Sequence, residues 1–406
     1  MWQQNYIDNL RFAVNDTSIA KLKKKYNCPV VVASGGPSLT KQLPLLKKVR
    51  EGVILVAAGS TINSLVKEDI IPDYIISIDG SPINYEHYKN LENLTSRFVY
   101  LMSSYPEIRT VFKNECYFAL SNTDKALIHN LEKITKQEVL ILPGGGSVAH
   151  YAFSLGMFIS SGPVTLIGQD LAYTGKQSHA NNNVLSKEID FNILEEKGIY
   201  IEGYNGGEVL TDYPFLGMKE TFENIVKLYE DEKDRVFNST EGGAKIKGYK
   251  QISFNEFCER FVTGEIIVKT PGEIEYVEEK TDKINLLKSL EEDLDIYNKI
   301  LKLLNNNIRL IESNKFTTRF SDRILKQLDK NDKEFEELCE MTALSLSLDP
   351  IKIEVLKHFK TIKGETLEEA YLRIKSQNLT MYKKFIFAVN DIIEYTNIVI
   401  NKIMEE

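Results

Sequence analysis

The chain has 406 residues, of which 43% are hydrophobic and 27% are charged, and its formal net charge at pH 7 is −8. This composition excludes a disordered protein, and the length is enough for two or three domains that each bury a core. Basic residues form no continuous tract for duplex nucleic acid, and the four scattered cysteines lack the spacing of a zinc site or a disulfide framework. No window approaches the ~18 uninterrupted apolar residues of a membrane helix, and the first residues lack the pattern of a secretory signal. We therefore expect a soluble, cytoplasmic protein.

Residues 1–28 are predicted to form a helical lead-in, and from residue 29 short apolar runs alternate with amphipathic segments. The runs are rich in β-branched residues and are typical of strands buried on both faces. The alternation predicts βαβ units in an α/β fold, with a doubly wound, mostly parallel, Rossmann-like sheet. The predicted strands are 30–33, 53–57, 74–78, 98–101, 139–142 and 164–167, and the predicted helices are 41–49, 62–68, 124–135 and 148–160.

The pattern of the sequence changes after residue 168. Residues 169–265 are rich in glycine, tyrosine and asparagine, which predicts loops and short elements that complete a site at the sheet edge. Segments 284–312, 319–346 and 365–404 repeat apolar residues at helical spacing, and Asp349-Pro350 predicts a turn after the second of them. We therefore expect a ligand-binding α/β domain over 29–268 and a C-terminal α-helical bundle over 269–406.

The first candidate site lies in the turn between strand 30–33 and the next helix. It contains Ser34, Gly35, Gly36, Pro37 and Ser38. Small residues let the backbone approach a ligand closely, and the amide groups at the start of a helix bind anions. Ser38 either caps the helix or donates its hydroxyl, and proline is tolerated in a first turn. A plain turn is the alternative, but the position at the carboxyl end of a strand favours a ligand.

Further candidates follow three other predicted strands. An acidic side chain just past a buried strand can bind ribose hydroxyls, although a local turn stabilised by its carboxylate explains it equally well. A second junction of strand, glycine turn and helix makes a ligand with two polar parts more plausible than one loop alone would. No D-x-D pair follows, and the sequence predicts no metal site. These candidates are Ser60, Asp79, Gly144, Gly145, Gly146 and Ser147.

The polar stretches after strand 164–167 hold the predicted catalytic pair. His179 is a candidate general base because the ordinary pKa of histidine is near neutral, and Asp170 is a candidate partner that orients it. An exposed loop histidine is the alternative. Additional groups for the phosphate or the sugar are Gln169, Tyr173, Asn238, Glu241 and Lys245.

Four of these motifs, in this order, resemble those of the motility-associated factor (Maf) glycosyltransferases. They are residues 34–39, 77–79, 168–173 with His179, and 238–248. The resemblance covers residues 1–265 and, less specifically, the helical tail, and it implies a variant GT-A fold similar to that of bacterial sialyltransferases. It implies an enzyme that moves a nonulosonic (sialic-type) acid from its CMP-activated form to Ser or Thr hydroxyls of flagellin. CMP is a good leaving group, so no metal or other cofactor is expected to be obligatory.

Two other functions remain open at this point. The same wider family includes 6-hydroxymethylpterin pyrophosphokinases, which use ATP and magnesium. Alternatively, the chain is a non-catalytic protein that binds flagellin through its helical bundle. The bundle itself is expected to present the acceptor, to form a homo-oligomer, or to serve only as a structural support.

Overall fold

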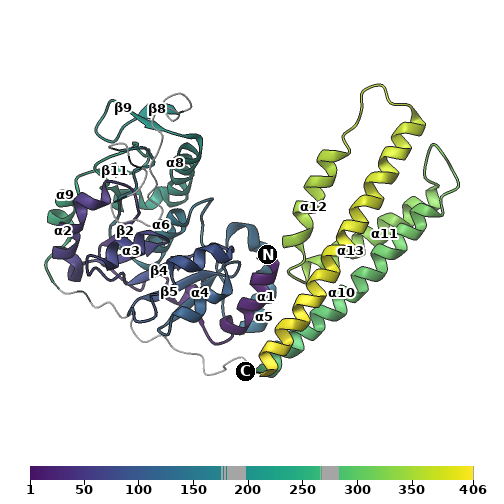
Figure 1. Ribbon diagram of the computed structural model, residues 1–406, viewed down its shortest axis with the longest axis horizontal. Helices are drawn as coiled ribbons and strands as arrows, with labels where there is room; N and C mark the ends of the chain where they lie inside the picture. The colour runs from purple at the N-terminus through teal and green to yellow at the C-terminus, as the bar shows by residue number, and fades with distance from the viewer. Residues whose placement is uncertain (175–176, 178–179, 181–197, 266, 268–282, 406) are drawn as a thin grey trace. The chain divides into compact units, whose positions relative to one another are not determined.

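The structure is a computed structural model that describes residues 1–174, 177, 180, 198–265, 267 and 283–405 (Figure 1). By compactness the chain divides into two units. The helical unit comprises Met1–Asn15, Asp124–Gln137 and Glu278–Glu406, and the α/β unit comprises Asp16–Thr123 and Glu138–Val277. The division predicted from the sequence, with boundaries after residues 28 and 268, stays a prediction about functional domains.

A nine-stranded sheet forms the centre of the α/β unit. Its order is β1-β6-β5-β4-β3-β2-β7-β10-β11, and every pairing described in it is parallel. The predicted α/β fold with a parallel, doubly wound sheet is therefore confirmed. The strands are β1 (Thr17–Ser18), β2 (Val30–Ala33), β3 (Ile54–Ala58), β4 (Tyr74–Ser77), β5 (Arg97–Leu101), β6 (Cys116–Ala119), β7 (Val164–Ile167), β10 (Val236–Asn238) and β11 (Lys250–Gln251).

One predicted strand is wrong. Residues 139–142 form only an isolated parallel bridge, between Leu120 and Ile141. Pro143 follows directly and has no N–H to donate, so the pairing cannot continue. The sheet instead uses β6, whose four residues are all buried but include no β-branched side chain, and which the sequence analysis missed for that reason.

Helices and short 3₁₀ segments connect the strands of the α/β unit. A separate antiparallel hairpin, β8 (Ile199–Glu202) with β9 (Glu208–Thr211), lies outside the main sheet. The α-helices are α2 (Leu39–Val49), α3 (Thr61–Val66), α4 (Pro106–Val111), α6 (Val148–Ile159), α8 (Tyr213–Ile225) and α9 (Phe254–Phe261). The 3₁₀ segments are η1 (Ile19–Leu22), η2 (Arg50–Gly52), η3 (Pro82–His87) and η5 (Val226–Arg235), while η4 (Asn122–Leu127) runs from this unit into the helical one.

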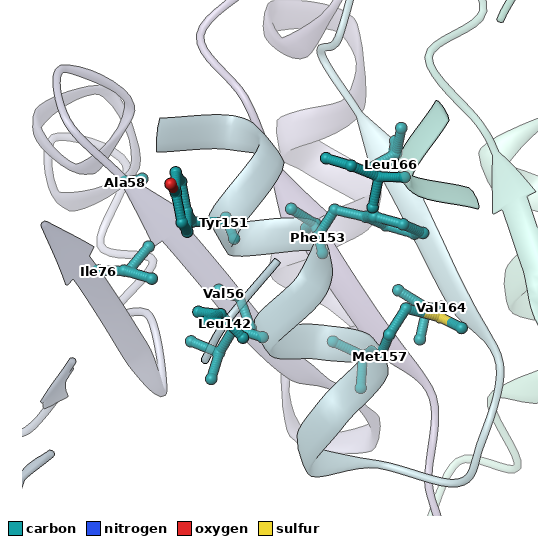
Figure 2. Packing of buried hydrophobic residues seen from close by; sticks show 14 of the residues in the cluster. Val56, Ala58, Ile76, Leu142, Tyr151, Phe153, Met157, Val164 and Leu166 are labelled. Atoms are coloured by element: carbon teal, nitrogen blue, oxygen red, sulfur yellow. The ribbon is translucent and has the colours of Figure 1, made fainter. Parts of the chain in front are cut away.

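Helix α6 packs across the middle of the sheet. It is apolar on almost all sides and contacts β2, β3, β4 and β7, as expected for a helix buried in a core. Figure 2 shows Phe153 and Met157 of α6 directed at Val164 and Leu166 of β7. Phe153 is fully buried, with further ring contacts to aromatic residues of α8, η5 and the segment before β11. This packing fixes the position of α6, whose first turn reaches the candidate site.

His150, in the first turn of α6, is fully buried in the neutral state. Its Nε2 lies 2.9 Å from the carbonyl oxygen of Met218, so Nε2 carries the proton and donates it. Nδ1 has no hydrogen-bond partner among the described residues. Burial lowers the pKa of His150 below its usual 6.5, more than the hydrogen bond to Met218 raises it.

This burial predicts a pH dependence of stability. The unfolded chain binds a proton on His150 below about pH 6.5, whereas the folded chain resists it to lower pH, so stability falls as the pH drops through this window. We expect His150→Gln, which keeps a donor for Met218, to flatten the dependence by at most about 1.4 kcal/mol per pH unit. Urea unfolding of both proteins from pH 7.5 to 5 measures this, and parallel curves for the two would contradict it.

The helical unit is a bundle, as predicted. Helix α10 packs against α11 and α13, α12 packs against α13, and α1 packs against both α12 and α13 (Figure 1). Pro350 does not begin a turn as predicted: it lies inside α12, in its second turn, where its missing N–H removes the helical hydrogen bond to the carbonyl of Leu346. None of the helices that the structure describes is long and apolar enough to cross a membrane. The helices are α1 (Trp2–Ala13), α5 (Ile128–Thr135), α10 (Lys283–Glu312), α11 (Asp322–Glu340), α12 (Ser345–His358) and α13 (Leu367–Glu405).

A buried polar network sets the register of this bundle. Asn307 of α10 donates to Asp332 of α11 at 2.8 Å and accepts a hydrogen bond from Asn331 at 2.7 Å. The hydroxyl of Tyr382 on α13 donates to the same Asp332 carboxylate at 2.9 Å. Because such groups are costly to bury without partners, only one axial alignment of the three helices satisfies them together.

Candidate active site

The sheet reverses its strand order between β2 and β7. Strands β3 to β6 are added on one side of β2, and β7, β10 and β11 lie on the other. Ligands of open α/β sheets bind beyond the carboxyl ends of the strands at such a reversal. A cavity of about 270 Å³ opens at this point. Its described lining residues are 33–36, 58–61, 147–149 and 168–171 with Asp79, Asn84, His87, Phe215 and Met218.

The loop after β2 forms one wall of the cavity with three of the predicted residues, Ser34, Gly35 and Gly36. The amide of Ser34 donates to the carbonyl of Ile167 at 3.0 Å, and the amide of Gly36 donates to the carbonyl of Gly168 at 2.8 Å. The hydroxyl of Ser34 also donates to the side chain of Gln169, another predicted residue that lines the cavity. The loops after β2 and β7 therefore form one hydrogen-bonded unit.

Gly36 is the point where these two loops come closest. A Cβ atom at this position would lie 2.2 Å from Oδ2 of Asp170 and 2.5 Å from the carbonyl oxygen of Gly168. Both distances are well inside van der Waals contact, and one of the neighbours is backbone. Only glycine fits here without moving the loops apart.

Asp170 joins the loop after β7 to the start of α2. Its side chain is buried, and it accepts hydrogen bonds from the Ser38 amide at 3.1 Å and the Ser38 hydroxyl at 2.7 Å. Burial raises the pKa of Asp170 above its usual value, while the hydrogen bond from the Ser38 hydroxyl lowers it. The Ser38 side chain does not cap α2, and its hydroxyl is donated to Asp170, so a role for it in ligand binding stays a prediction. Pro37 lies between this contact and Gly36.

A buried glutamine that the sequence analysis missed clamps the same region. The amide nitrogen of Gln42, on α2, donates to the backbone carbonyls of Ser239 and Thr240. Its side-chain oxygen accepts a hydrogen bond from the Gly168 amide at 3.0 Å. A glutamine inside an amphipathic helix carries no motif, so only the fold reveals that it links α2 to the ends of β7 and β10.

The opposite wall of the cavity carries two of the other predicted residues, Ser60 after β3 and Asp79 after β4. His87, at the end of η3, lines the same wall and was not predicted. Burial raises the pKa of the Asp79 carboxyl above its usual value, and the electrostatic influence of the nearby His87 acts in the other direction. The two side chains therefore line one cavity as neighbours.

Of the four residues predicted in the glycine turn before α6, only Ser147 is among the described residues that line the cavity. Ser147 lines the cavity and caps α6, because its hydroxyl accepts a hydrogen bond from the amide of Ala149 at 3.3 Å. Gly144 packs against the ring of Tyr151, where a Cβ would lie 2.3 Å from the ring, and Gly145 packs against Thr221. Gly146 has open space around it. A role for these three glycines in donor binding stays a prediction.

Two predicted residues line a different cavity of about 450 Å³, beside the β8–β9 hairpin. Tyr173 donates its hydroxyl to Asp212 at 2.8 Å. Glu241 has a φ of +58°, which is rare for a residue with a side chain, and it accepts a hydrogen bond from the amide of Phe254 at 2.9 Å. Their placement separates them from Ser34 and Gly36, although Gly242 packs against Ser38 and connects the two regions.

The remaining predicted residues line neither cavity. Asn238 is fully buried, and its amide donates to Gln251 at 3.0 Å. Lys245 forms an exposed ion pair with Glu202 at 2.6 Å. His179, the predicted base, lies outside the described residues, so its pairing with Asp170 stays a prediction.

The main cavity offers an anion backbone groups rather than side-chain cations. Its described lining includes the charged side chains Asp79 and Asp170 and the imidazole of His87, but no lysine or arginine. The start of α6, with the positive end of its helix dipole, and the amide of Gly35 line the cavity instead. In the described part of the chain, no three His, Cys, Asp or Glu side chains gather as a metal site would require.

Comparisons with known proteins agree with this fold. Residues 4–176 match the family model described as 6-hydroxymethylpterin diphosphokinase MptE-like. No curated protein gives a significant match to the chain. Among solved structures, the chain is similar to a Maf glycosyltransferase from Magnetospirillum magneticum AMB-1, with a TM-score of 0.55 and 14% identity. The match covers 99% of this chain and 59% of that one. The chain therefore matches the MptE-like family model over residues 4–176 and shares its fold over almost its whole length with a Maf glycosyltransferase.

Proposed function

We propose that the protein is a glycosyltransferase that moves a nonulosonic acid from a CMP-activated donor to Ser or Thr hydroxyls of flagellin. The observation that carries the proposal is the cavity at the reversal of the sheet, where the loops after β2 and β7 meet. The start of α6 and the Gly35 amide suit the phosphate of a nucleotide, and the apolar residues Phe215 and Met218 suit a base or sugar ring. The similarity to a Maf glycosyltransferase structure supports the same activity.

The proposed reaction breaks the bond between the anomeric carbon of the sugar and a phosphate oxygen of CMP. Negative charge then develops on the departing phosphate. The amides of Ser34, Gly36 and Ser38 already donate within the protein and hold the loop in place. The Gly35 amide and the first turn of α6 stabilise that charge without moving. In this reaction Asp170 holds the loop through Ser38. No obligatory metal is part of the proposal.

A second candidate function has its own support. The family model that matches residues 4–176 is described by a pterin diphosphokinase activity, which transfers a diphosphate from ATP. The start of α6 and the Gly35 amide would then bind the phosphates of ATP. The two functions differ in the nucleotide and in the need for magnesium.

Calorimetric titration of the full chain with CMP, CDP, UDP, AMP and ATP, each with magnesium and with EDTA, separates them. We expect CMP to bind selectively and with the same affinity in both buffers. ATP binding that requires magnesium would favour the diphosphokinase, and absence of any nucleotide binding would favour a flagellin-binding protein without catalysis. Transfer to purified flagellin, followed as a mass increase, then tests the acceptor.

A further inference from the structure

His87 is the one imidazole among the described residues that line the main cavity. It ends the 3₁₀ segment η3 and is half-buried, so a bound ligand can reach its ring. It belongs to none of the motifs found in the sequence. The function proposed above needs a group that accepts a proton from the acceptor hydroxyl, and His87 has the chemistry for it.

Asp79 gives this imidazole an acidic neighbour. It lies at the end of β4, lines the same wall, and interacts electrostatically with His87. A carboxylate beside an imidazole orients the ring and stabilises the imidazolium that forms when the ring takes a proton. Asp170, by contrast, uses both carboxylate oxygens on Ser38.

Both residues stand on anchored backbone. The side-chain amide of Asn63, on α3, donates to the carbonyl of His87 at 3.1 Å, and the hydroxyl of Tyr88 donates to the carbonyl of Ile76 in β4 at 3.3 Å. The amide of Tyr105 donates to the carbonyl of Asp79 at 2.9 Å. The segment that carries His87 is therefore tied to the sheet on which Asp79 stands, as a catalytic pair requires.

We propose that His87 is the general base of the transfer and that Asp79 is its positioning residue. The proposal rests on the glycosyltransferase function. The acceptor oxygen forms a bond to the anomeric carbon of the sugar, and its proton passes to a ring nitrogen of His87. The bond between that carbon and the phosphate oxygen breaks, and its electron pair leaves with CMP.

The test compares His87→Gln, Asp79→Asn and His179→Gln with the unmodified full chain. The donors are CMP-activated pseudaminic, legionaminic and sialic acids, and flagellin is the acceptor. We expect His87→Gln to lower kcat by about 10²–10⁴-fold, with CMP affinity changed less than threefold. Its pH–rate profile should lose the limb in which the rate rises with pH, and added imidazole should restore part of the rate. Asp79→Asn should lower kcat less and shift that limb.

His129→Gln is the matched control, because His129 is exposed on α5 in the helical unit and should leave affinity, rate and pH profile unchanged. Besides Asp79, the charged groups nearest to His87 in the chain are Glu86 and Lys89, which pair with each other.

A His87→Gln protein with normal kcat and pH profile, beside a working unmodified enzyme, would overturn only this proposal. So would loss of the limb in His179→Gln alone. An unmodified chain that binds no CMP and transfers no sugar would overturn the proposed function as well.

Discussion

Gly36→Ala is expected to abolish nucleotide binding in the main cavity while the chain still folds. The new methyl group would lie 2.2 Å from Oδ2 of Asp170 and 2.5 Å from the backbone of Gly168, so the loops after β2 and β7 must separate. Overpacking of this kind lowers the free energy of unfolding by about 1–3 kcal/mol. A displacement of the loop by the order of 1 Å is worth about 10²-fold in rate. Calorimetry with CMP and a single-turnover transfer assay measure the two losses.

Gly217→Ala is the matched control for this substitution. Gly217 lies in α8 of the same unit, and a Cβ there meets no atom within 4 Å. Alanine in a helix is more stable than glycine by about 0.8–1.0 kcal/mol, so this variant should unfold at the same or a higher urea concentration. If Gly36→Ala bound CMP as tightly as Gly217→Ala, the close approach of the two loops would have no role in the site.

Phe153→Ala should give the largest loss of stability in the α/β unit. The side chain is fully buried between α6 and the sheet (Figure 2). It also contacts the rings of Phe222, Tyr229 and Tyr249. Removal of a buried phenylalanine costs about 3–5 kcal/mol, because apolar contact is lost and a cavity remains. Urea unfolding followed by tyrosine fluorescence and circular dichroism measures the change.

Phe153→Leu tests how much of this loss comes from the missing apolar volume. Leucine keeps most of the apolar volume, so we expect it to lose less than half of the free energy that alanine loses. Since α6 begins at the cavity with Ser147, the alanine variant should also bind CMP more weakly than the leucine variant at the same temperature. Equal stabilities of the two variants would show that Phe153 is not part of the core as described.

Local patterns predicted most of the central sheet because its strands are short, β-branched and buried on both faces. They failed where pairing with other strands decides whether a segment forms a strand. The run 139–142 has strand composition but ends at Pro143, and β6 has pairing partners on both sides although its sequence contains no β-branched residue. Pro350 is a similar case among the helices: it lies in the second turn of α12, and the helix continues past it although proline removes a helical hydrogen bond. A proline alone therefore does not predict where a helix ends.

The candidate site shows a similar limit. Strand-end loops could be predicted, since parallel strands bring their carboxyl ends to one edge, and Ser34, Gly36 and Asp79 do line one cavity. Lys245 could not be placed, because its partner Glu202 comes from a hairpin with no clear signal. His87 could not be found either, since it reaches the cavity through a 3₁₀ segment without apolar periodicity.

The helical unit has a consequence for how the chain is made. Its earliest part, Met1–Asn15, and its middle part, Asp124–Gln137, are separated along the chain from Glu278–Glu406, which supplies the helices they pack against. During synthesis from the N-terminus, α1 and α5 therefore emerge long before their partners, and the sheet has its strands while this second core is incomplete. The two early helices keep their apolar faces uncovered until translation is nearly finished, so a ribosome that stalls before α10 would release a chain that chaperones must hold.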